Sequence, residues 1–153
     1  MAQESNEFRP VSDPVLLVFH RQDEDNPVRE TSKEAVVNEL LFLKNIEVAE
    51  PLVLADLVDY QAGRVVSRTF VQNQVMSLTL FAFDKGEGLS THTAAGDAFV
   101  QILDGEAVIT IGDREVTVKS GQVVTMPANV PHSLHAYERF KMLLVVVKGT
   151  GAA

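Results

Sequence analysis

Short runs of Val, Leu, Ile, Phe and Thr recur every 8–12 residues from residue 50 onward, and turn residues separate them. Many short, evenly spaced strands without intervening helices predict an all-β sandwich or barrel. The stretch AVITIGDREVTV is typical of a hairpin that turns at Gly112 and Asp113. We expect strands near residues 52–58, 63–71, 75–83, 97–103, 106–112, 114–118, 122–126, 131–137 and 140–148.

The first 48 residues show a different pattern of hydrophobic and polar positions. Residues 1–13 are polar and without period, and residues 14–20 form a short apolar run whose length alone does not separate strand from helix. Thr31 and Glu34 match a capping box, and the apolar spacing behind them predicts one short amphipathic helix over residues 32–44. We therefore divide the chain into an N-terminal arm with a helix (1–48) and a β-barrel domain (49–153), packed as a single unit.

Length, net charge and cysteine content make several classes of function unexpected for this chain. The chain has 153 residues, enough for one domain with one core. Its formal net charge is −8, which disfavours phosphate backbones and anionic membrane surfaces, so we expect neither nucleic-acid nor membrane partners. It contains no cysteine, which excludes disulfides, zinc–thiolate sites and thiol catalysis. With no signal-like or membrane-spanning run in the sequence, a cytoplasmic protein is the expectation.

Two segments carry the candidate chemistry, GEGLSTHTAAGDAFVQILDG (86–105) and GQVVTMPANVPHSLHA (121–136). Together they resemble the two sequence motifs of the cupin family. The positions that match are Gly86, His92 and Gly105 in the first segment and Gly121, Pro127 and His132 in the second. Asn129 stands where the family has an internal glycine, a mild change because Asn tolerates a left-handed backbone. The resemblance covers about residues 63–148 and implies a double-stranded β-helix, the jelly-roll barrel.

The resemblance also implies where a metal would bind. The family's ligands are two His and one Glu from the first motif and one His from the second. His92 and His132 occupy two of these positions, whereas Ala94 and Ala98 occupy the other two. A catalytic centre needs about three protein ligands, so two imidazoles make a weak site. The cofactor stays open, with a divalent metal ion on His92 and His132 as the candidate.

Strand alternation predicts which neighbours share the site. Side chains repeat every two residues along a strand, so residues 98, 100 and 102 face the interior and Asp97 and Gln101 face outward. Asp97 becomes a third metal ligand only if the strand bulges near Gly96. By the same parity His132, Leu134 and Ala136 face inward, whereas His135 faces outward. The predicted pocket is therefore two imidazoles among apolar side chains, suited to an apolar ligand with one polar group.

Three functions remain open at this point. The first is a small-molecule binding module with its pocket around His92 and His132, with or without metal. The second is an enzyme for isomerase, epimerase or lyase-type chemistry on a small organic or sugar acid, with a metal or a pocket histidine as general base. The third is a non-catalytic homodimeric interaction protein that uses Phe99, Leu103 and the segment 142–147 as its interface.

Overall fold

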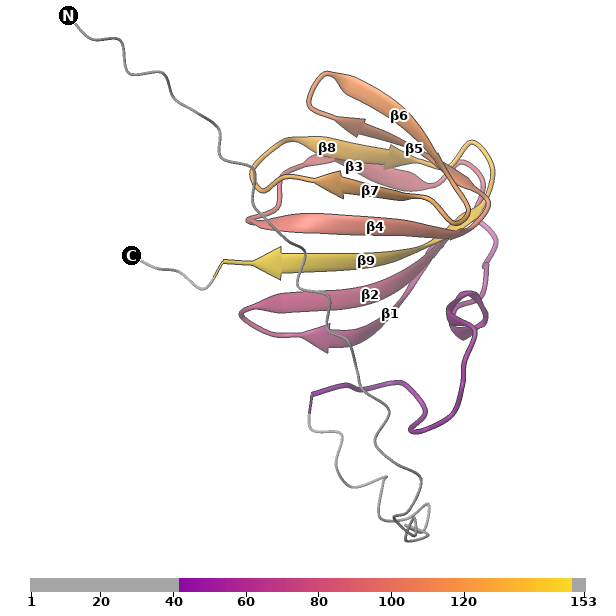
Figure 1. The fold of residues 1–153 in the computed structure, drawn as a ribbon. Coiled ribbons are helices and arrows are strands. Elements are labelled where there is room, and N and C mark those ends of the chain that lie inside the picture. The colour runs from indigo at the N-terminus through magenta and orange to yellow at the C-terminus, as the bar shows by residue number, and fades with distance from the viewer. Residues whose placement is uncertain (1–41, 150–153) are drawn as a thin grey trace, which may run out of the picture. The chain divides into compact units, whose positions relative to one another are not determined.

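The computed structural model describes residues 42–149, which form two antiparallel sheets packed face to face (Figure 1). One sheet has five strands in the order β1-β2-β9-β4-β7, and the other has four in the order β3-β8-β5-β6. A short 3-10 helix, η1 (Leu54–Leu57), precedes the first strand. The strands are β1 (Val65–Gln72), β2 (Met76–Phe83), β3 (Gly88–His92), β4 (Gly96–Asp104), β5 (Glu106–Ile111), β6 (Arg114–Lys119), β7 (Val123–Met126), β8 (His132–His135) and β9 (Phe140–Lys148).

The all-β jelly-roll prediction is confirmed, and so are most of the predicted strands. The hairpin turn at Gly112 and Asp113 is present, since Ile111 pairs with Arg114. Strands 63–71, 75–83, 97–103 and 140–148 appear as β1, β2, β4 and β9 with small shifts at their ends. None of the helices within residues 42–149 is long and apolar enough to cross a membrane.

Two sequence predictions of secondary structure need correction. The expected strand at 52–58 is instead η1 and its flanks, whose apolar side chains lie on the outer face of the five-stranded sheet. Length and hydrophobicity alone could not separate these alternatives. The second correction is β3, which the sequence did not reveal because GLSTH is mostly polar and contains only one β-branched residue. The predicted helix at 32–44 lies mostly outside the described residues, and its last three residues, 42–44, are not helical.

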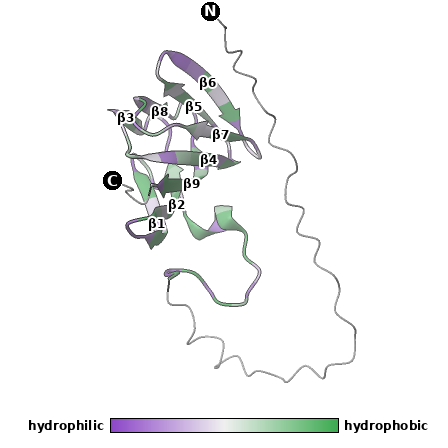
Figure 2. Ribbon diagram, turned by 60° about the vertical axis from the view of Figure 1, so that its left-hand side comes forward, coloured by the Kyte–Doolittle hydropathy of each residue, from purple (hydrophilic) through white to green (hydrophobic). Residues whose placement is uncertain are grey.

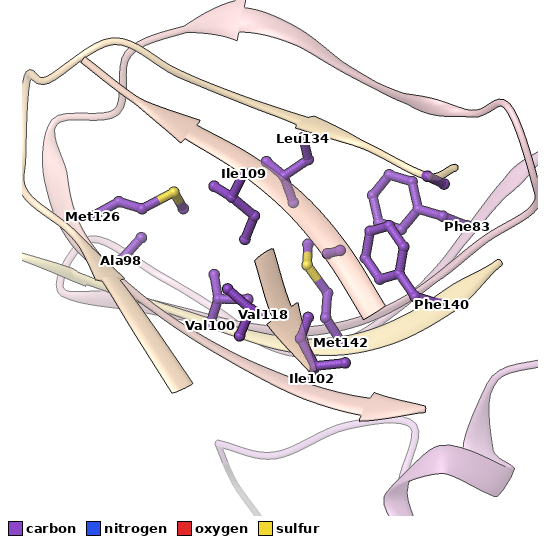
Figure 3. Close-up of a cluster of buried hydrophobic side chains, with 12 residues drawn as sticks. Phe83, Ala98, Val100, Ile102, Ile109, Val118, Met126, Leu134, Phe140 and Met142 are labelled. Carbon is purple, nitrogen blue, oxygen red and sulfur yellow. The ribbon is translucent and has the colours of Figure 1, made fainter. Parts of the chain in front are cut away.

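The main core lies between the sheets. Along β4, residues 96, 98, 100 and 102 are buried, which confirms the predicted inward face. Figure 3 shows Ala98 and Met126 toward one end of this core and the rings of Phe83 and Phe140 toward the other. The fully enclosed members of the cluster are Phe83, Ala98, Val100, Ile102, Ala107, Ile109, Val118, Met126, Leu134, Ala136, Phe140 and Met142.

A second apolar cluster lies on the outer face of the five-stranded sheet. Val58 is buried there against Phe70 and Leu80, and the flanking chain from Ile46 to Tyr60 contributes further side chains. Figure 2 shows η1 coloured largely as apolar. Part of this outer face is therefore covered by the chain's own segment before β1.

Candidate functional site

His92 and His132 meet at one end of the barrel, as the motif positions predicted. His92 ends β3, His132 begins β8, and the two residues are direct cross-strand partners. Their ring centroids lie 4.4 Å apart with the planes at 63°, an edge-to-face contact. His132 is only 5% exposed, whereas His92 is exposed to solvent. One imidazole is therefore set into the barrel wall and the other stands at its mouth.

Both rings are oriented by the same kind of hydrogen bond. Nδ1 of His92 lies 2.8 Å from the carbonyl oxygen of Ser90, and Nδ1 of His132 lies 3.0 Å from that of Val130. A carbonyl oxygen only accepts, so in the neutral rings Nδ1 carries the proton and donates it. Nε2 is then the lone-pair nitrogen of each ring, free to accept a hydrogen bond or to ligate a cation.

The remaining family ligand positions carry no donor atoms. Ala98 is buried in the core, and Ala94 lies in the turn before β4. Asp97 faces outward, as the strand parity predicted, and within residues 42–149 no three His, Cys, Asp or Glu side chains are grouped to hold a metal ion. His92, His132 and Asp97 therefore do not form a three-ligand cluster, and the described residues do not fit a complete catalytic metal centre.

Asp97 has a different role, which the sequence did not reveal. Its Oδ1 accepts a hydrogen bond of 2.8 Å from the backbone N–H of Ala128, in the loop between β7 and β8. Two further backbone bonds of 2.8 Å hold the same loop, from Asn129 N–H to Ala94 O and from Gly112 N–H to Pro131 O. These bonds fix the chain just before His132. A carboxylate that bonds a loop 31 residues away leaves no local sequence signal.

Asn129 and His135 behave as the sequence analysis expected. Asn129 has φ 62°, the left-handed conformation that its place in the motif requires. His135 is exposed on the outer face of the four-stranded sheet, and its ring contacts that of Tyr137 at 4.4 Å. The inward set of His132, Leu134 and Ala136 is buried, so the face assignment of β8 is confirmed.

The interior behind the histidines is densely packed. Met126 and Ile109 fill the space beside Ala98, and Ile111 pairs with His132 at the barrel mouth. Surface hollows occur elsewhere: one of about 340 Å³ lies over β4 and β7, lined by Asp97, Ala98, Phe99, Thr125 and Pro127. Through its strand partner Ile111, His132 thus adjoins a core that is already filled by apolar side chains.

The opposite end of the barrel contains a second polar cluster. The Tyr60 hydroxyl donates a 2.6 Å hydrogen bond to Asp104, and the cations of Arg139 and Lys141 lie 4.7 and 4.9 Å from the Tyr60 ring centroid. Burial, followed by the bond to the Asp104 carboxylate, raises the pKa of Tyr60 well above its ordinary value. Lys141 also donates to the carbonyl of Ala55 at 2.6 Å, so this cluster fastens the segment before β1 to the barrel.

Comparison with known proteins agrees with this geometry. Residues 79–148 match the family model of the cupin domain. An uncharacterized protein from Streptomyces coelicolor is 35% identical over 77 residues, which span 50% of this chain and 73% of that protein. A crystal structure of a conserved protein of unknown function from Streptococcus pyogenes is 44% identical, with a TM-score of 0.72, covering 74% of this chain and 100% of that one. A cupin superfamily protein from Desulfitobacterium hafniense is 34% identical, with a TM-score of 0.67, covering 70% of this chain and 98% of its own.

Proposed function

The chain belongs to the cupin superfamily, and on that basis we propose that it binds a small, mainly apolar organic molecule at the barrel mouth formed by His92 and His132. The observation that carries the proposal is the shared orientation of the two rings. Each Nδ1 is engaged by a backbone carbonyl, so both Nε2 atoms are left as acceptors, on two rings whose centroids lie 4.4 Å apart. Such a pair accepts hydrogen bonds from a hydroxyl or N–H group of a mainly apolar ligand.

A divalent metal ion is optional in this proposal. Two imidazoles supply fewer protein ligands than a catalytic centre uses, so an ion held there would depend on water or on the bound molecule for its other ligands. Zinc titration therefore serves as a separate arm of the experiment.

The test uses the full chain and three small probes with one donor group each: phenol, benzyl alcohol and indole. We expect these probes to shift the NMR signals of the His92 and His132 rings in the wild-type protein, and to lose that effect in His132→Ala. His135→Ala is the matched control, since His135 lies on the same strand but faces outward. Binding that is absent in the wild type, or equal in His132→Ala, would overturn the assignment. Zn²⁺ alone, followed by calorimetry in the same variants, shows whether the pair also holds a cation.

The second candidate is an enzyme for isomerase, epimerase or lyase-type chemistry on a small organic or sugar acid. The same tautomer supports it, because a neutral imidazole with a free Nε2 is able to act as a general base. Incubation with pyruvate or glucuronate in D₂O, followed by NMR, detects proton abstraction next to the carbonyl or carboxylate. Deuterium incorporation that vanishes in both His92→Ala and His132→Ala favours the enzyme, whereas binding without exchange favours the binding module.

A further inference from the structure

The side of the five-stranded sheet that packs against the four-stranded sheet changes in polarity from one half to the other. On β9 and β4 this inner side supplies apolar residues to the main core, namely Met142, Leu144, Val146, Ala98, Val100 and Ile102. On β1 and β2 it also carries four hydroxyl side chains, those of Ser67, Thr69, Ser77 and Thr79. The inner faces of two packed sheets are expected to be apolar. These four hydroxyls therefore need an explanation.

The pairing of the strands fixes which way these side chains point. Cross-strand partners lie on the same face of a sheet. Ser77 pairs with Val146 and Thr79 pairs with Leu144, and both apolar partners pack against the main core. Thr69 on β1 is in turn the partner of Thr79. All three hydroxyls thus face the space between the sheets.

The two histidines lie over this half of the sheet. Strand β6 contacts β4 and β5 contacts β9, so β8 and β3, which follow in the same direction, lie over the half that contains β2 and β1. The two imidazoles, carried by β8 and β3, therefore face the strands that carry the hydroxyls. Val146 pairs with both Ser77 and Ala98, which places Ser77 at the histidine end of the barrel and Thr79 one inward position deeper.

The space between the sheets is open to solvent along this side. Strands β1 and β3 are the edges of their sheets, and none of the described strands joins them. Ser67 is exposed although its partner Phe81 packs against the main core, and His92 is exposed as well. Thr69 and Leu89, which face the same space, are half-buried. A small molecule is therefore able to reach the imidazoles and the hydroxyls from the same side.

Thr69 and Thr79 form a hydroxyl pair on this inner wall. Their Oγ1 atoms lie 3.1 Å apart, so one hydroxyl donates to the other and one O–H hydrogen remains. Neither side chain has another hydrogen bond within residues 42–149. Thr79 is only 9% exposed, and a donor in such a place costs free energy when it lacks an acceptor. The pair therefore offers a donor to a bound molecule, whereas each histidine offers Nε2 as an acceptor.

We propose that the Thr69–Thr79 pair is a second anchor of the binding site and that the ligand is a small hydroxy-carbonyl compound. This inference rests on the proposed binding at His92 and His132. The hydroxyl of such a compound donates to a histidine Nε2, and its carbonyl oxygen accepts the remaining hydrogen of the threonine pair. A ligand with a single polar group leaves one of these two anchors unused.

An NMR titration of the full chain with matched probes tests the second anchor. Para-hydroxyacetophenone is compared with para-ethylphenol, and meta-hydroxyacetophenone with meta-ethylphenol, because each pair shares its shape and hydroxyl but only the ketone has a carbonyl. In the wild type, at least one ketone should bind about two- to tenfold more tightly than its ethyl counterpart, the gain from one neutral hydrogen bond. The double variant Thr69→Val, Thr79→Val should lose this gain and should bind the ethylphenols as the wild type does.

Both threonines are replaced together because either hydroxyl alone is able to donate to the ketone. Exchanging both partners of a hydrogen bond for apolar groups of the same shape is nearly neutral for stability, and thermal melting checks that the variant folds. Thr117→Val is the matched control, since Thr117 is exposed on the outer face of the four-stranded sheet. It should keep the preference for the ketone.

The outcomes separate this inference from the proposed function. If none of the probes shifts the ring signals of His92 and His132, or if binding survives in His132→Ala, the binding site itself is overturned and the second anchor with it. If the ethylphenols bind through His132 but neither ketone gains affinity in the wild type, only the second anchor is overturned. A gain that persists in the double variant overturns the second anchor in the same way.

Discussion

The two ends of the barrel differ in the side chains that line them. At one end Phe83 and Phe140 stack with centroids 4.6 Å apart, and the hydroxyl of Tyr60 is bonded to Asp104 just outside them. At the other end the main core finishes with Ala98 and Met126, and two imidazoles retain lone-pair nitrogens. Large buried rings and satisfied polar groups contribute mainly to stability, whereas acceptor nitrogens at the histidines leave scope for binding. This difference is the basis of our proposal that a ligand binds at the His92–His132 end.

The largest effect on stability is expected from removing an aromatic ring at the Phe83–Phe140 end. Phe140 is fully buried, so Phe140→Ala should lower the free energy of unfolding by about 3–5 kcal/mol, because it removes apolar burial and leaves a cavity. Urea denaturation measures the loss. Tyr137→Ala is the control, since that ring is 63% exposed, and it should change stability by no more than about 0.5 kcal/mol. Equal effects of the two substitutions would show that the aromatic end is not a stabilising cap.

A smaller effect is expected at the histidine end. Asp97→Ala removes the acceptor for the Ala128 N–H and should cost about 0.5–1.5 kcal/mol, the usual net value of one hydrogen bond. Hydrogen exchange of the Ala128 amide should accelerate at the same time, because the loop before His132 loses a tether. Asp97→Asn keeps an acceptor oxygen and should retain most of the protection. If Ala128 exchanges equally fast in the wild type and in Asp97→Ala, the carboxylate does not hold this loop.

The smallest effect concerns the pH dependence of stability at the Tyr60 end. The pKa of the Tyr60 phenol is raised in the folded state above its ordinary value of 10.0, mainly by burial and then by the bond to Asp104. Its contribution is therefore complete below pH 10 and is lost as pH rises from that value toward the folded pKa. Tyr60→Phe should abolish this part of the alkaline loss. Thermal midpoints of both proteins between neutral and strongly alkaline pH measure the difference, and parallel curves would contradict the assignment.

The sequence predicted the fold and the place of the site for identifiable reasons. Alternation along β4 and β8 placed Ala98 and His132 inward and Asp97 and His135 outward, because side chains on a strand must alternate. The spacing of the motif glycines and histidines brought His92 and His132 together. The secondary-structure prediction failed for η1, where an apolar run packs on the outer face of a sheet. It also failed for β3, where a polar segment is ordered by pairing with β8.

What the sequence determined by itself was the set of strands with clear alternation, the end of the barrel that carries the imidazoles, and the loss of two family ligand positions to alanine. Only the tertiary structure decided the rest. It placed the Nδ1 atom of each histidine against a backbone carbonyl and turned Asp97 into a tether for a distant loop. The physical reason is that each of these features depends on atoms brought together from distant parts of the chain, which local patterns of hydrophobicity do not encode.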